Sequence, residues 1–149
     1  MTAVVVMYRC PRPEGQPKHK SAWQDAQRAI RTVRSEAPAR GLNPDRIGLM
    51  GFSAGGHLTL MTSVNAQTRA YEPIDAIDEV SCKVQWACPI YPAYTLTDGA
   101  DSTNRNGGNG DDAVIVPEFA FDDDTPPMCF FHGDADKYSA MASVKCWEK

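Results

Sequence analysis

Short apolar runs alternate along the chain with longer stretches in which apolar residues recur every three or four positions. Four of the runs have the length of a strand and are bounded by turn-forming residues. They occupy residues 4–8, 46–52, 84–90 and 128–131. Continuous apolar runs of this length are typical of strands that are buried on both faces of a parallel sheet.

The stretch 21–36 has the pattern of an amphipathic helix. Its apolar residues recur at helical spacing, and its arginines fall toward the opposite side. Ser21 and Gln24 have the spacing of a capping box, which places the helix start at Ser21. Two further helices are predicted at residues 57–64 and 139–147.

The connections between these elements are polar. Residues 65–81 form an excursion, and residues 97–112 have the Gly, Asn and Asp content of a loop. Residues 114–116 are predicted as a short strand or as an extended patch. Tyr91 and Tyr94 follow a strand end and are candidates for lining a substrate cleft, with ordinary packing as the alternative. Strands that alternate with helices indicate an α/β fold with a mostly parallel sheet and helices on both faces.

The composition is that of one globular domain. The chain has 149 residues, 42% hydrophobic and 23% charged, so it can bury one core but is too short for two ordinary domains. Its net charge of −4 argues against a nucleic-acid-binding surface, which requires clustered basic residues. Because no apolar stretch reaches about 18 residues, no membrane span is predicted.

No pattern in the sequence predicts a metal ion or a cofactor. The five cysteines include no CxxC pair, and we expect Cys88 and Cys129, which lie in apolar runs, to be small core residues. The acidic residues within 101–112 lack the spacing of an EF-hand loop. The acidic run at 122–124 has no histidine or cysteine nearby, and we expect it to be solvated.

The most informative chemical motif is Gly51-Phe52-Ser53-Ala54-Gly55, a GxSxG sequence between a predicted strand and a predicted helix. A nucleophile elbow requires this context, because the serine must sit in a strained turn with its hydroxyl exposed. We expect Gly51 and Gly55 to leave room where the two backbones come close, and the N–H of Ala54 to face the developing oxyanion. The alternative is a glycine-rich turn with an incidental serine.

A serine nucleophile needs a base, normally a histidine that a carboxylate orients. In an elbow-containing fold the order along the chain is serine, acid, histidine, and the acid follows a later strand. Asp134 and Asp136 both follow the run at 128–131, and we favour Asp136 because it lies deeper in the turn and, in part, because of a family resemblance. The alternative is that both carboxylates cap a helix or a loop.

None of the three histidines has the position expected of that base. His19, His57 and His132 all precede Asp136, and only a short segment follows it. We expect His57 to pack or cap within its helix, His132 to make local hydrogen bonds and His19 to be solvated. A second oxyanion donor normally comes from a loop ahead of the first predicted strand, and this sequence does not contain that loop.

These motifs resemble those of the α/β-hydrolase superfamily, in its carbohydrate-esterase-like branch of acetyl xylan and feruloyl esterase relatives. The resemblance implies that Ser53 is the nucleophile, Ala54 an oxyanion donor and Asp136 the triad acid. It also implies an HGGG-like loop upstream and a histidine downstream, neither of which is found here. The segments that carry the resemblance are residues 3–9, 22–29, 43–58, 91–92, 124–127 and 132–136.

On this resemblance, residues 1–149 are expected to form a single incomplete α/β-hydrolase domain from the middle of a longer esterase. Such an enzyme attacks a small-molecule or glycan ester with Ser53, forms an acyl-enzyme and releases it with water, without a cofactor. Because the base is missing, we expect little activity from this chain alone. The alternative is a degenerate hydrolase-fold module that binds a glycan or a protein partner without catalysis.

The family sheet has a strand between the first two strands predicted here, and the sequence does not contain it. Residues 4–8 therefore either pair directly with residues 46–52 or lie beside a gap with unpaired backbone groups. Unpaired groups of this kind are unfavourable when they are buried, so we expect the isolated chain to be marginally stable.

Overall fold

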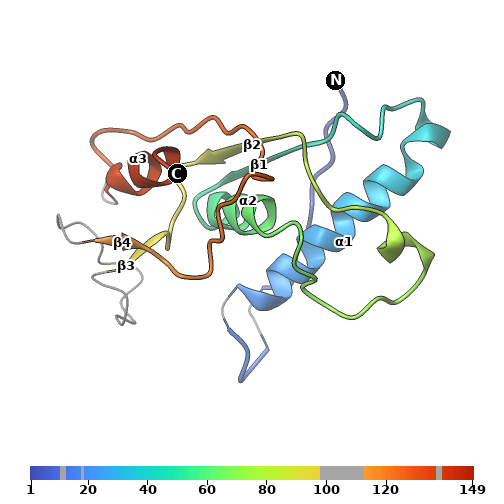
Figure 1. Cartoon of the computed structure of the whole chain (residues 1–149), viewed down its shortest axis with the longest axis horizontal. Coiled ribbons are helices and arrows are strands. Elements are labelled where there is room, and N and C mark those ends of the chain that lie inside the picture. Colours follow the sequence, from blue (N-terminus) through green and yellow to red (C-terminus); the bar gives the residue numbers. More distant parts are fainter. Residues whose placement is uncertain (11–12, 18, 98–112, 137–138) are drawn as a thin grey trace.

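The computed structural model describes residues 1–10, 13–17, 19–97, 113–136 and 139–149 (Figure 1). Its elements in chain order are α1 (Lys20–Glu36), η1 (Pro38–Arg40), β1 (Gly48–Phe52), α2 (Ala54–Val64), η2 (Ala76–Glu79), β2 (Trp86–Ile90), β3 (Leu96–Thr97), β4 (Val114–Ile115) and α3 (Met141–Trp147). The elements η1 and η2 are short 3-10 helices. Within the described ranges, no helix combines the length and the apolar character that a membrane crossing needs.

A parallel sheet lies at the centre of the fold. Strand β1 pairs with β2 in parallel, with Phe52 opposite Ile90. On the other edge of β2, residues 128–131 run parallel to it, and the N–H of Tyr91 donates to the carbonyl of Phe131 at 2.6 Å. The predicted α/β class with a parallel sheet is confirmed, although the fourth predicted strand forms isolated bridges rather than a continuous ladder.

Helix α1 is amphipathic as predicted, but the predicted capping box is wrong. The helix starts at Lys20, with His19 at the N-cap and no side-chain cap. The hydroxyl of Ser21 is buried without a hydrogen-bond partner, and the Nε2 group of Gln24 donates to the carbonyl of Ala70 at 3.1 Å. The side-chain amide of Gln24 therefore bonds a distant backbone carbonyl, and not the N-terminal end of α1 as the sequence pattern predicted.

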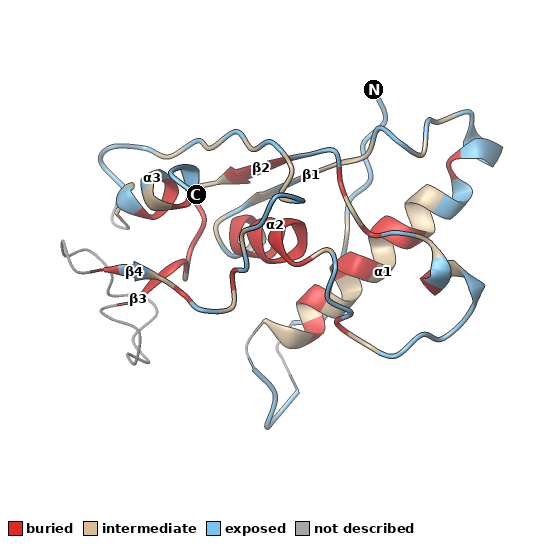
Figure 2. Ribbon diagram, in the orientation of Figure 1, coloured by how far each residue is buried: buried red, intermediate tan, exposed pale blue. Residues whose placement is uncertain are grey.

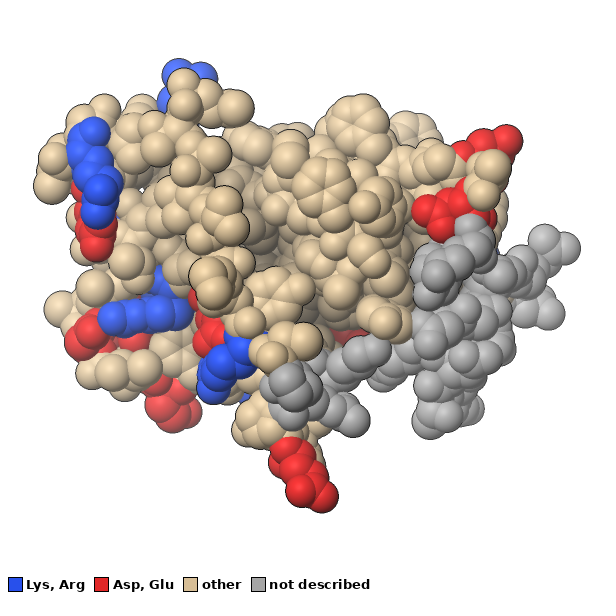
Figure 3. All heavy atoms as spheres, turned by 180° about the vertical axis from the view of Figure 1, so that it is seen from behind, with Lys and Arg blue, Asp and Glu red and all other residues tan. Residues whose placement is uncertain are grey.

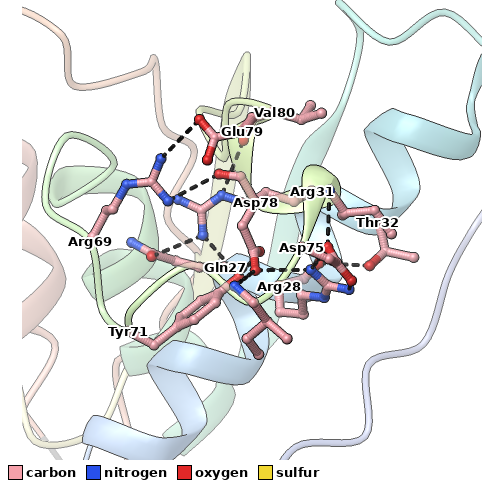
Figure 4. A network of polar contacts seen from close by, with 12 residues as sticks. Gln27, Arg28, Arg31, Thr32, Arg69, Tyr71, Asp75, Asp78, Glu79 and Val80 are labelled. Atoms are coloured by element: carbon pink, nitrogen blue, oxygen red, sulfur yellow. Dashed lines mark hydrogen bonds and ion pairs between the residues drawn. The ribbon is translucent and has the colours of Figure 1, made fainter.

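A network of charged side chains ties α1 to the polar excursion that follows α2 (Figure 4). Arg28 pairs with Asp75 at 2.7 Å and with Asp78 at 3.0 Å. Asp78, which is 1% exposed, also accepts hydrogen bonds from the hydroxyl of Tyr71 and the backbone N–H of Ile74. Burial alone would raise the pKa of Asp78, but these donors hold it well below its usual range. Arg28, Tyr71, Asp75 and Asp78 are called the α1 clamp below.

The predicted strand at residues 4–8 is wrong. In the described part of the chain this segment pairs with no strand, and Val5 and Met7 are 89% and 95% exposed. It lies beside α1 instead, where the Arg9 guanidinium pairs with Asp25 at 2.9 Å. A strand forms only where its N–H and C=O groups have neighbours to bond, so apolar character alone does not produce one.

The two faces of the parallel sheet differ in what covers them. On the covered face, Leu49 packs near Ile30 of α1, and Gly51 lies against α2. The bare face carries Met50 (54% exposed), Phe52 (55%), Trp86 (41%) and Phe131 (57%). The prediction that these strands are buried on both sides is wrong for the bare face. Of the two predicted helical layers, the described residues show the one that α1 and α2 form.

Helix α2 is the most buried of the three α-helices in the described ranges (Figure 2). It begins at Ala54, three residues before its predicted start, and is buried continuously from Gly56 to Val64.

Strand alternation places Cys129 on the side of the bare face. Cys129 is exposed, so the core position predicted for it is wrong, whereas Cys88, which lies on the same side of the sheet opposite Met50, is buried as predicted.

Charged side chains gather toward the margins of the surface that is seen from behind in Figure 3. The upper middle of that surface shows no blue or red atoms (Figure 3). Ion pairs such as Arg40 with Glu36, at 2.6 Å, are largely exposed and contribute little to stability.

Candidate active site

Ser53 occupies the sharp bend between β1 and α2. Its backbone has φ 52° and ψ −117°. Residues other than glycine rarely adopt a positive φ. Ser53 is partly exposed, whereas the helix behind it is buried. The bend is therefore not a relaxed continuation of the helix, and its hydroxyl lies at the carboxyl end of a parallel strand.

Backbone hydrogen bonds hold this bend from both sides. The N–H of Ser53 donates to the carbonyl of Ile90 at 3.0 Å, at the end of β2. The carbonyl of Ser53 accepts from the N–H of His57 at 3.0 Å and from the N–H of Ala93 at 3.1 Å. Ser53 is thus hydrogen-bonded to β2, to α2 and to the loop after β2, and these bonds stabilise its strained backbone conformation.

Two glycines allow the strand and the helix to come this close. A Cβ atom on Gly51 would lie 2.2 Å from the carbonyl oxygen of Gly55, and one on Gly56 would lie 2.9 Å from that of Ile90. The steric role predicted for Gly55 is wrong, because a Cβ there would meet nothing within 4 Å. Gly55 contributes its backbone to the close contact, and Gly56 provides the space.

Ala54 is the first residue of α2 and is exposed. The N–H groups of a helix's first turn have no partner within the helix, and the helix dipole makes this end positive. Ala54 therefore lies at the positive end of α2, directly after Ser53.

The loop after β2 holds two more residues with positive φ, Tyr91 at 34° and Tyr94 at 58°. The ring of Tyr91 lies 6.0 Å from that of Phe52, centroid to centroid, so two exposed aromatic side chains flank the elbow. The Tyr91-Pro92 pair in the sequence signals a break, because a residue before proline avoids the helical region. It does not signal the sign of φ, which comes from the contacts of the loop with α2.

Asp134 and Asp136 lie in the turn that follows residues 128–131, and both are exposed. The N–H of Asp136 donates to the carbonyl of Gly133 at 3.2 Å. Because residues 128–131 run parallel to β2, this turn leaves the sheet at the same edge as Ser53. The assignment of Asp136 as the acid stays a prediction.

The histidines have partners of their own. His57 is buried in α2 with Nδ1 3.2 Å from the carbonyl of Ala93, and burial lowers its pKa to about 4, so the ring is neutral near pH 7. His132 Nδ1 lies 2.9 Å from the hydroxyl of Ser143, which confirms the predicted local hydrogen bond.

The prediction that His19 is solvated is wrong. Its side chain is only 21% exposed, and Nδ1 lies 3.8 Å from the carboxylate of Glu118. Val116 and Phe119 share a buried cluster with Trp23 of α1, and no local pattern in the proline-rich segment signals this contact.

Comparison with known proteins identifies the family to which this elbow belongs. Residues 2–146 match the model of the BD-FAE family. The chain belongs to the BD-FAE family. Over 73 residues it is 33% identical to the probable carboxylic ester hydrolase LipM of Mycobacterium tuberculosis, a match that covers 49% of this chain and 16% of LipM. An acetylxylan esterase of Xylanibacter ruminicola is 36% identical over 72 residues, which are 43% of this chain and 15% of that enzyme.

Solved structures share the fold of this BD-FAE chain. Esterase 2 of Thermogutta terrifontis is 26% identical, with a TM-score of 0.63 over 86% of this chain and 47% of that one. The acetyl ester-xyloside bifunctional hydrolase of Caldicellulosiruptor lactoaceticus is 24% identical, with a TM-score of 0.69 over 95% of this chain and 53% of that one. The chain thus spans about half the length of these structures and has a partial α/β-hydrolase fold.

Proposed function

We propose that this BD-FAE chain supplies Ser53 as the nucleophile of a serine ester hydrolase that acts on carbohydrate esters. The observation that carries the proposal is the positive φ of Ser53, held between a parallel strand and the first turn of a helix. Such a conformation costs about 1–3 kcal/mol, and strain of this kind is concentrated at sites where a side chain is presented for chemistry.

In the proposed reaction, Ser53 Oγ forms a bond to the ester carbonyl carbon and passes its proton to a base. The carbonyl oxygen becomes an oxyanion, which the N–H of Ala54 stabilises at the positive end of α2. The bond to the alcohol oxygen then breaks, the alcohol takes the proton from the base, and the acyl group stays on Ser53. Water attacks this acyl-enzyme by the same steps and regenerates the free hydroxyl.

Asp136 is proposed as the carboxylate that orients the base, because its turn lies at the sheet edge that carries Ser53. None of the three histidines is proposed as the base. Nδ1 of His57 is engaged with Ala93, Nδ1 of His132 lies at the Ser143 hydroxyl, and His19 lies beside Glu118. We therefore propose that this chain alone turns over esters slowly.

The relatives support the substrate class. One is named an acetylxylan esterase and another a probable carboxylic ester hydrolase. The exposed rings of Phe52 and Tyr91 beside the elbow offer an apolar surface against which a sugar ring can pack. A small acyl group on a glycan fits both observations.

The test is selective covalent labelling. The chain is incubated with an alkyl fluorophosphonate, and the labelling rate of each serine is followed by peptide mass spectrometry. Ser35, an exposed serine on the regular helix α1, is the internal control. We expect Ser53 to react at least about tenfold faster than Ser35, because an oxyanion donor acts even without a base.

The Ser53→Ala variant should lose only this label and keep its far-ultraviolet circular dichroism. Equal labelling of Ser53 and Ser35 would overturn the proposal. Equal labelling together with binding of an acetylated xylan oligosaccharide, measured by calorimetry, would instead favour the module that binds a glycan without catalysis.

A further inference from the structure

His19, His57 and Glu118 meet in the interior although they come from three distant segments of the chain. One ligand atom from each, an imidazole nitrogen or a carboxylate oxygen, lies within 4.8 Å of the other two. His19 precedes α1, His57 lies in the second turn of α2, and Glu118 follows β4. Two imidazoles and one carboxylate are the donor set of many zinc sites.

The backbone around each member is anchored independently of this cluster. The carbonyl of His19 accepts the N–H of Trp23 at 2.9 Å, and the carbonyl of Glu118 accepts from the Nδ2 group of Asn65 at 2.9 Å. The ring of Phe119 packs 5.0 Å from that of His57, centroid to centroid. The fold thus brings the three side chains together without needing an ion to do so.

His57 has the outer contact that is usual for a metal-binding histidine. Its Nδ1 lies 3.2 Å from the carbonyl of Ala93, so the proton sits on Nδ1 and the lone pair is on Nε2. A backbone carbonyl behind the ring holds both the tautomer and the orientation. The neutral, buried ring is the form of histidine that binds a metal.

We propose that His19, His57 and Glu118 bind one divalent transition-metal ion, with zinc as the best fit. The ion would join the start of α1, the N-terminal part of the buried helix α2 and the segment after β4. This inference does not rest on the proposed esterase activity, because none of the three ligand side chains is assigned a role in ester hydrolysis.

The geometry requires a small contraction. Tetrahedral zinc has bonds of about 2.0–2.2 Å, so its donors lie about 3.3 Å apart. The side chains of His19 and Glu118 are 21% and 12% exposed, and they lie at a helix start and in a connecting segment. Rotation of these two side chains toward the buried His57 closes the set, and a water molecule completes four ligands.

The donor set also predicts which ions bind. Imidazole nitrogens suit zinc and cobalt, whereas magnesium and calcium require oxygen ligands. We therefore expect zinc and cobalt to bind, and magnesium and calcium at the same concentration to have no effect on the melting temperature.

The experiment uses the whole chain, stripped with a chelator and with its exposed thiols, Cys10 and Cys129, blocked by alkylation. Zinc binding is measured by calorimetry and by the melting temperature, and cobalt binding by its visible absorption. We expect one zinc per chain, a higher melting temperature and the visible bands of four-coordinate cobalt with nitrogen and oxygen donors.

The variants His19→Asn and Glu118→Gln should each weaken zinc binding at least about tenfold. Asn is a good N-cap residue, and Gln keeps the shape and the backbone of Glu118, so both chains should fold. The control His132→Asn removes a histidine outside the cluster and should bind zinc like the parent chain. The proposal is overturned if no zinc binds, or if His19→Asn and Glu118→Gln bind it unchanged.

Discussion

The covered and bare faces of the parallel sheet are built from alternating residues of the same strands, yet only one of them is packed. On the covered face, the backbone of α2 approaches so closely that Gly51 has no room for a Cβ atom. On the bare face, the side chains of Met50, Phe52 and Phe131 are more than half exposed. Apolar character is similar on both sides, so burial here is decided by which helices are present and not by the strand sequence.

The two sides of the sheet also differ in the contacts that stabilise the folded chain. The covered side combines backbone contact at the elbow, a buried neutral histidine and the α1 clamp, each of which depends on close fit or on a paired charge. The exposed apolar side chains on the bare face depend neither on close fit nor on a paired charge. An apolar surface of this kind is a packing or association surface that the described residues leave open. Substitutions on the two faces should therefore differ sharply in cost.

The largest effect is expected at Gly51. In Gly51→Ala the new methyl group overlaps the carbonyl of Gly55, which is helix backbone and cannot move aside without displacing α2. We expect a loss of at least about 4 kcal/mol in the free energy of unfolding, or no folding at all. Urea denaturation followed by circular dichroism measures it.

Gly55→Ala is the matched control for that substitution. Nothing lies within 4 Å of the new Cβ, and alanine is up to about 1 kcal/mol more favourable than glycine in a helix. The free energy of unfolding should be unchanged or slightly higher. If Gly51→Ala and Gly55→Ala behaved alike, the close contact between β1 and α2 would be disproved.

The second effect is a pH dependence that comes from His57. Its pKa is about 6.5 in the unfolded chain and about 4 in the fold, because burial disfavours the charged ring. As the pH falls from 6.5 to 4, the unfolded chain binds a proton that the folded chain does not. The free energy of unfolding should therefore drop by about 3 kcal/mol across this window and be at its full value above it.

Chelator should be present during this measurement, so that no metal competes with protons at His57. Glu118 and His19 face the ring and act in opposite directions, the first raising and the second lowering its pKa. The His57 ring signal in an NMR titration reads the pKa directly, with a midpoint expected near 4. A midpoint near 6.5 would show that the ring is not buried.

The third largest effect on stability is expected in the α1 clamp. Asp78→Asn removes the charge that pairs with Arg28 while keeping the size of the side chain. The Tyr71 hydroxyl and the Ile74 N–H bond different oxygens of Asp78, so the single oxygen of Asn leaves one of these two donors without its acceptor. We expect the free energy of unfolding to fall by about 2 kcal/mol. Urea titration at pH 7 measures the change.

Glu79→Gln is the control for the clamp. Glu79 neighbours Asp78 in η2, but its side chain is 72% exposed and 3.9 Å from Arg69. Its replacement should change the free energy of unfolding by less than about 0.5 kcal/mol. A loss as large as that of Asp78→Asn would mean that the overall negative charge of η2, and not the buried pairing, stabilises α1.

These regions were not equally predictable from the sequence. The elbow could be predicted because its determinants are local: a strand, a serine and glycines within a few residues of one another. Even there, the pattern could not say that Gly56 provides the space expected of Gly55. The clamp and the His19–His57–Glu118 cluster were missed, because their members are distant in the chain (Arg28 and Asp75 are 47 residues apart) and meet only through tertiary packing.

The failure at residues 4–8 has a related cause. A run of β-branched residues favours an extended backbone, but it does not show which strand would form hydrogen bonds with it. The same holds for the bare face, since the hydrophobic pattern of β1 predicted burial on both sides and the structure provides helices for one.

The smallest effect on stability is expected on the bare face. Phe131→Ser and Met50→Ser remove side chains that are 57% and 54% exposed, so little buried contact is lost, and the free energy of unfolding should fall by less than about 1 kcal/mol. Removal of exposed apolar area should instead weaken self-association, which sedimentation velocity measures over a range of protein concentrations. A loss above about 2 kcal/mol from either substitution, with unchanged sedimentation, would show that this face is packed and would end the contrast between the two sides of the sheet.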